Sequence, residues 1–212
     1  MRRSTVLLGS TIAFVLLYGV GIAALGTPPE ARDGGAAVVA WFRANGGHVH
    51  VSLLCTTFAL VLFAVYAAIV KNALPAPYGD VFFVGAIALI VESVVQGWVW
   101  AGLALHPDQL APATARTLLD VAVFWGPLLT GATITMLAPV ALLAFQRRGG
   151  LAPWLGVLSL IALVEQAIET ITIFGSRGFT APGGPMNLIL GAGLVTIVFL
   201  CLGVSLARSF ND

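Results

Sequence analysis

Residues 51–70 read VSLLCTTFALVLFAVYAAIV, a stretch that contains no charged side chain. About 20 consecutive apolar residues are enough for an α-helix to cross the hydrocarbon core of a bilayer, which is about 30 Å thick. The stretch therefore predicts a transmembrane helix, which we place at about residues 48–70.

The composition of the whole chain supports the same conclusion. Of its 212 residues, 59% are hydrophobic and 9% are charged, whereas soluble domains average about 25% charged residues. A soluble protein of this size could not cover its surface with so few charges, but a protein surrounded by lipid does not need them. The net charge of +1 also offers no basic field that would attract nucleic acid. We expect one all-α domain, residues 1–212, built as a polytopic membrane helix bundle.

Five more apolar stretches flank the first, which predicts about six transmembrane helices. We place the spans at residues 5–26, 48–70, 81–105, 117–145, 154–174 and 186–206. The first span follows two arginines, as a signal peptide would, but it is long for one and we expect it to stay uncleaved. Pro127 and Pro139 should kink the fourth span. Residues 34–45 predict a short interfacial helix before the second span.

The positions of Lys and Arg predict the orientation, because cytoplasmic loops of membrane proteins are enriched in both. With both termini in the cytoplasm, the inner side carries Arg2, Arg3, Lys71, Arg147, Arg148 and Arg208, and the outer side carries Arg32, Arg43, Arg116 and Arg177. The inner side therefore carries more basic residues than the outer side, six against four. We expect an N-in, C-in, multi-pass protein of the inner (cytoplasmic) membrane, with the lipid bilayer as its main partner.

The third predicted span carries an acidic residue near its middle. Glu92, Gln96 and Trp100 follow one another at intervals of four residues, so they share one stripe of the helix. We treat these three residues as candidates for a site that binds a ligand or a proton.

The fifth predicted span carries a second polar stripe. Glu165 and Glu169 are four residues apart, and Gln166 borders them. Both spans run outward in the predicted topology, and Glu92 and Glu165 lie at similar depth. The two stripes could therefore face each other inside the bundle, and the fifth-span residues join the list of candidates.

Placing these acidic side chains at the predicted depth in the membrane costs free energy. A carboxylate at the centre of a bilayer costs about 2.5–3.5 kcal/mol on insertion scales, and no predicted span holds a Lys or Arg at that depth. Three interpretations remain open. The acids and their neighbours could form a neutral polar core that joins helices. They could line a functional cavity for protons, a cation or a small ligand. They could also contact a partner membrane subunit that supplies a basic residue.

Two histidines, His48 and His50, lie at the outer start of the second span. Two residues apart on a helix, they would point to different faces, so we interpret them as interfacial and treat them as weak candidates for a metal site. Such a site would draw on His48, His50 and Glu169, with His106 as a further candidate. No HExxH, CxxC or CxxCH motif is present, and no P-loop or nucleophile elbow. We predict no cofactor and favour a role without catalysis.

Three stretches of the sequence resemble one family of membrane proteins. TPPEARDGGAAVVAWFRANGG (27–47) follows the first span, GLAPWLGVLSLIA (150–162) follows a basic turn, and GFTAPGGP (178–185) precedes the last span. In this arrangement nearly the whole chain is similar to a large family of small six-helix integral membrane proteins of unknown function from high-GC bacteria. The resemblance implies a six-helix inner-membrane protein and implies no activity. The acids in VESVVQGWVW (91–100) and VEQAIETIT (164–172) depart from the apolar helices expected of that family.

Three functions follow as hypotheses. The first is a non-enzymatic protein that binds a small apolar or cationic ligand, or protons, at a carboxylate site between the third and fifth spans. The second is an accessory or assembly subunit of a larger membrane complex, because the chain is small and its loops are short. The third is a membrane enzyme acting on a lipid or isoprenoid, in which a buried glutamate protonates an apolar substrate.

Overall fold

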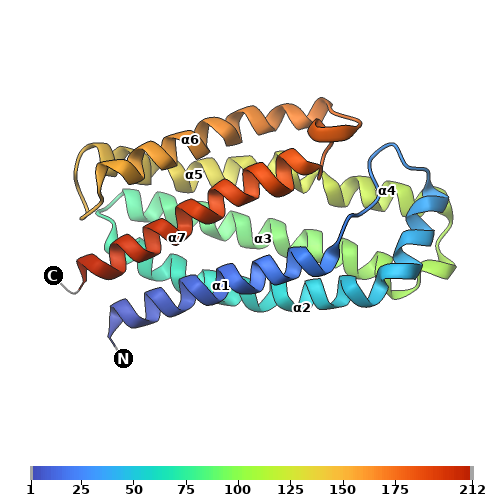
Figure 1. The fold of residues 1–212 in the computed structure, drawn as a ribbon, viewed down its shortest axis with the longest axis horizontal. Helices are drawn as coiled ribbons and strands as arrows, with labels where there is room; N and C mark the ends of the chain where they lie inside the picture. Colours follow the sequence, from blue (N-terminus) through green and yellow to red (C-terminus); the bar gives the residue numbers. More distant parts are fainter. Residues whose placement is uncertain (1, 211–212) are drawn as a thin grey trace.

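The computed structural model describes residues 2–210, and within them every regular element is a helix. Six segments are long and apolar enough to cross a membrane, which confirms the predicted all-α, six-span fold (Figure 1). The helices are α1 (Arg3–Leu25), α2 (Gly35–Ala73), α3 (Tyr78–Leu105), α4 (Pro112–Val123), α5 (Trp125–Phe145), α6 (Pro153–Glu169) and α7 (Ala192–Ser209). A 3₁₀ turn (Thr170–Phe174) extends α6, and a π-helical turn (Met186–Gly191) leads into α7. Two further 3₁₀ turns, Pro107–Gln109 and Gly178–Thr180, lie in connections.

The second span is longer than the sequence predicted. Helix α2 has 39 residues, so at 1.5 Å per residue it is about 58 Å long. The prediction of a separate interfacial helix at residues 34–45 is wrong, because residues 35–45 form the first turns of α2. No proline interrupts residues 35–73, and the pair Gly46–Gly47 lowers helix propensity without ending the helix.

The fourth span is two helices, α4 and α5, which meet at Phe124. Pro127 lacks the N–H that would bond to the carbonyl of Val123, so a helical hydrogen bond is missing beside the break at Phe124. The predicted distortion at Pro127 is therefore confirmed. Pro139, in contrast, lies inside α5, which continues past it to Phe145.

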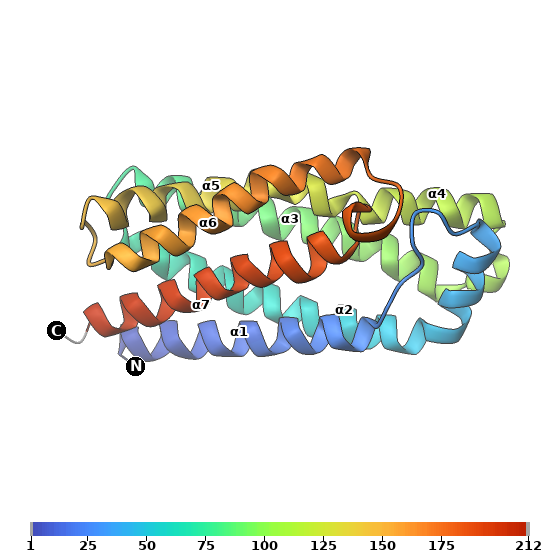
Figure 2. The ribbon, with the colours of Figure 1, turned by 45° about the horizontal axis from the view of Figure 1, so that its top comes forward.

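The six spans form a ring in chain order. Helix α1 packs on α2, α2 on α3, α3 on α5 and α5 on α6, while α7 packs against both α6 and α1 and closes the ring. Figures 1 and 2 both show α1 beside α2 and α5 beside α6. The two termini lie at the same end of the bundle, together with the α2–α3 and α5–α6 connections (Figure 1).

The buried apolar residues form two clusters along the bundle. The larger one surrounds Tyr66 and Phe199, and the Tyr66 hydroxyl donates a hydrogen bond of 3.0 Å to the Phe199 carbonyl oxygen. The smaller one joins α2, α3 and α4 around Phe42, Trp100 and Leu119. Side chains of both clusters line one cavity. The candidate site therefore lies where the two parts of the core meet.

Candidate functional site

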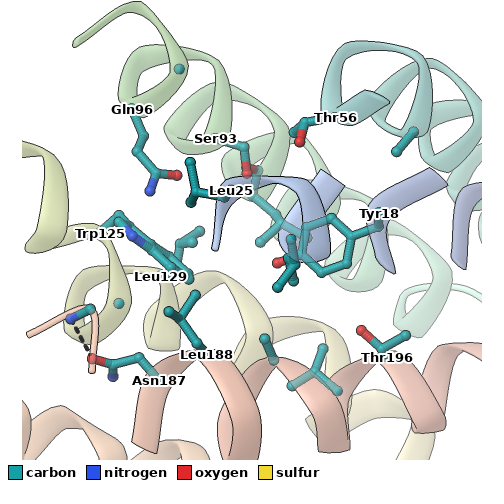
Figure 3. A pocket seen from close by; sticks show the side chains of 18 of the residues that line it. Tyr18, Leu25, Thr56, Ser93, Gln96, Trp125, Leu129, Asn187, Leu188 and Thr196 are labelled. Atoms are coloured by element: carbon teal, nitrogen blue, oxygen red, sulfur yellow. Dashed lines mark hydrogen bonds between the residues drawn. The ribbon is translucent and has the colours of Figure 1, made fainter. Parts of the chain in front are cut away.

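A cavity of about 170 Å³ lies inside the helix ring, in the half of the bundle away from the termini. Residues of α1, α2, α3, α5, α6 and the last span line it. Most of its wall is apolar or aromatic, and Figure 3 shows Tyr18, Trp125, Leu129 and Leu188 around it. A cavity of about 150 Å³ in another protein holds benzene. This space is therefore large enough for a molecule about the size of one ring.

One side chain, Gln166 of α6, connects the two acids of that helix. Its Nε2 lies 2.9 Å from Glu165 Oε2 and 2.5 Å from Glu169 Oε2, so the amide donates to both carboxyls. Because both oxygens bond to the same nitrogen, the two carboxyl groups lie within about 6 Å of each other, close enough for strong coupling. Thr133 of α5 donates a hydrogen bond to Gln166 Oε1, which fixes which end of the amide faces the acids.

Asn187, in the π-helical turn, holds the second oxygen of Glu169. Its Nδ2 donates to Glu169 Oε1 at 2.5 Å and to Thr172 Oγ1 at 3.3 Å, and its Oδ1 accepts from the backbone N–H of Gly183 at 2.8 Å. Figure 3 shows this last bond beside the cavity. Both Glu169 oxygens are thus held by amide donors from two different elements.

Two glycines leave the space that this arrangement needs. A Cβ on Gly191 would lie 1.9 Å from Glu169 Oε2, and a Cβ on Gly126 would lie 2.5 Å from the Asn187 side chain. Any other residue at either position would displace a member of the hydrogen-bonded group. Asn187 and Gly191 both belong to the π-helical turn, so this short element supplies both a donor to Glu169 and the small residue beside it.

The site holds two buried carboxyl groups, and no basic side chain among residues 2–210 pairs with either of them. Glu165, Gln166 and Glu169 are buried, and the ion pairs found within residues 2–210 involve only acids near the ends of the bundle: Glu30, Asp80, Asp108 and Asp120. Amide donors orient a carboxylate but do not neutralise it. A proton or a bound cation must therefore balance Glu169 and Glu165.

The structure places the predicted third-span residues in two environments. Gln96 and Trp100 line the cavity, and Figure 3 shows Gln96 reaching into it from α3 on the side of Trp125. Trp100 is 5% exposed, and its indole Nε1 has no hydrogen-bond partner among the described residues. Trp100 is therefore a buried donor beside an open volume.

Glu92 is not part of this group. It is half-buried on α3, it does not line the cavity, and its Oε2 has no hydrogen-bond partner among residues 2–210. The sequence predicts a site between the third and fifth spans, which are α3 and α6 in the structure, and α5 packs against both. Gln96, Trp100, Gln166 and Glu169 of these two spans line one cavity, whereas Glu92 and Glu165 do not line it.

The histidine candidates lie apart from the acids. His48 and His50 are exposed on α2, with the buried Val49 between them. Within residues 2–210, no three His, Cys, Asp or Glu side chains come close enough to hold a metal ion.

Asn187 and Thr133 belong to the hydrogen-bonded group but are not among the candidates predicted from the sequence. Asn187 carried a usable signal, because it is an amide inside a predicted span, and polar groups within the membrane usually have a structural or functional partner. The sequence offers no such signal for Thr133, because threonine is common in membrane helices and its hydroxyl often bonds only to a backbone carbonyl of the same helix.

Comparisons of the chain with protein-family models, with curated proteins and with solved structures find no match. The class that the fold defines is therefore a multi-pass helical membrane protein, and the resemblance to the six-helix bacterial family stays a prediction.

Proposed function

We propose that this chain is a multi-pass protein of the bacterial inner membrane, with both termini in the cytoplasm, that binds a small molecule in the cavity within the helix ring. The observation that carries the proposal is the position of Glu169. It is a buried carboxyl group in the wall of a cavity, held from two sides by amides and lacking a basic partner within residues 2–210.

The cavity favours this interpretation over a purely structural polar core. Polar side chains that only join helices need close packing around them, as in most membrane helix contacts. Here the hydrogen-bonded group of Gln166, Glu169 and Asn187 borders a volume of about 170 Å³. Binding pockets have the same composition, a mostly apolar wall with a few convergent polar groups.

The experiment uses the purified full chain in lipid nanodiscs and benzyl alcohol, a neutral molecule with one ring. Ligand-observed NMR measures its binding, with empty nanodiscs as the blank. Thr196 lines the cavity and faces into it (Figure 3), so Thr196→Phe should fill the space and abolish saturable binding. The matched control is Ile197→Phe, because Ile197 is 48% exposed and does not line the cavity.

Saturable binding to the wild type and to Ile197→Phe, but not to Thr196→Phe, is the expected result. If the wild type binds no more probe than empty nanodiscs, the proposal is wrong. The same conclusion follows if Thr196→Phe binds as well as the wild type.

A second candidate function, an accessory subunit of a membrane complex, draws on Glu92. This acid is half-buried on α3 and has one buried oxygen without a partner among the described residues. A basic residue from another subunit would satisfy it. Analytical ultracentrifugation in mild detergent tests this candidate, and a lone monomer without any co-purifying protein would argue against it.

A further inference from the structure

The carboxyl group of Glu169 restricts the charge of a ligand in the cavity. Glu169 accepts one hydrogen bond on each oxygen, and each carboxylate oxygen has two lone pairs. It therefore keeps the capacity to accept another donor, and it is 3% exposed in the cavity wall. The neighbouring Glu165 adds a second carboxyl within about 6 Å. An anionic ligand would be repelled here, and a cationic one attracted.

The aromatic side chains around the cavity also favour a cation, provided it is organic. Phe14, Tyr18, Phe63, Trp100 and Trp125 contribute to the wall, and the faces of such rings attract ammonium groups while their surfaces accept apolar groups. Hard metal cations need six or more oxygen ligands. The largely apolar wall does not offer such a shell, so Mg²⁺ and Ca²⁺ fit poorly.

The unpartnered indole N–H of Trp100 is an independent sign that the cavity receives a polar molecule. A buried donor without an acceptor costs about 1–3 kcal/mol, and Trp100 lines the cavity with its Nε1 unsatisfied among the described residues. A ligand that presents an ammonium group to Glu169 and an acceptor atom or the face of a ring to the Trp100 N–H would satisfy both groups.

We infer that the ligand is a small organic cation, with about one ring of apolar bulk and a protonated or quaternary amine that pairs with Glu169. This inference rests on the proposed function and adds the chemical class of the ligand. It assigns Glu169 as the residue that selects for charge, and the aromatic wall as the part that accepts the apolar body.

The test compares benzylamine, which is protonated at neutral pH, with the neutral benzyl alcohol of nearly the same shape. In the wild type in nanodiscs, benzylamine should bind about tenfold or more tightly than the alcohol, because a charge-assisted hydrogen bond adds to the same apolar contact. Nanodiscs of zwitterionic lipid prevent the membrane surface from collecting the amine. Glu169→Gln should remove most of this preference, because it removes the carboxylate that pairs with the amine. A circular-dichroism spectrum with the helical content of the wild type shows that the variant is folded.

The matched control is Glu92→Gln, which removes a carboxyl group on α3 that does not line the cavity. It should leave the preference for the amine unchanged. Equal binding of the two probes by the wild type would overturn the inference while leaving the proposed cavity intact. A preference that survives Glu169→Gln, or that Glu92→Gln abolishes, would overturn the assignment to Glu169. Failure of both probes to bind would instead count against the proposed function.

Discussion

At the scale of single residues, Gly191 shows how the absence of a side chain supports a buried acid. A Cβ there would lie 1.9 Å from Glu169 Oε2 and 2.9 Å from Gln166 Nε2. We therefore expect Gly191→Ala to break the hydrogen-bonded group and to lower the free energy of unfolding by about 1–3 kcal/mol, the usual cost of overpacking.

Gly193 provides the matched comparison, because no atom lies within 4 Å of a Cβ built there. Gly193→Ala should be neutral or stabilising by about 0.5–1 kcal/mol, since alanine favours a helix over glycine. Thermal unfolding of both variants in the same detergent measures the difference. Equal stability of the two variants would show that Glu169 does not occupy the space next to Gly191.

At the scale of elements, Arg116 connects α4 to the chain between α1 and α2. Its Nη1 donates to the carbonyl oxygens of Glu30 and Asp33, at 2.9 and 3.1 Å, and its Nη2 pairs with Asp120 at 2.6 Å. A lysine has one nitrogen and cannot reproduce this fork. Arg116→Lys should cost about 1–3 kcal/mol and should make residues 26–34 more sensitive to limited proteolysis.

The exposed pair of Arg43 and Asp108 is the control for that prediction. Both side chains are more than half exposed, at 62% and 68%, whereas the Arg116 side chain is 16% exposed. Exposed ion pairs contribute about 1 kcal/mol or less, so Arg43→Lys should leave both stability and proteolysis nearly unchanged. If the two variants behave alike, Arg116 does not hold the connection between α1 and α2 in place.

At the scale of the whole molecule, the ring of six spans puts both termini at one end (Figure 1). The proposed N-in, C-in orientation predicts that Arg148→Cys, in the α5–α6 connection, reacts with a membrane-impermeant maleimide only after cells are broken. Asp108→Cys, in the connection between α3 and α4, should react in intact cells. The chain's own Cys55 and Cys201 lie inside spans, and replacing them with alanine gives a clean background. The reverse labelling pattern would show that the orientation is inverted.

The spans and the class of protein could be read from the sequence because they depend on local properties. Length and hydropathy of each apolar stretch decide whether a helix crosses the membrane, and five of the six predicted spans agree with the structure to within a few residues at their ends. The missing backbone N–H of Pro127 likewise acts on its own turn of helix. The continuous α2 was missed, because the polar and small residues at 34–45 suggested a separate element although nothing in them stops a helix.

The site depended on which helices become neighbours, and that arises from packing between residues far apart in the chain. Helical spacing correctly grouped Gln166 with Glu165 and Glu169, since these contacts lie within α6. It could not show that Gln96 would line the same cavity as Glu169 while Glu92 would not. Nor could it show that Asn187 would reach Glu169 across the last loop. Periodicity along one helix defines a polar stripe, but only the contacts between helices define what that stripe faces.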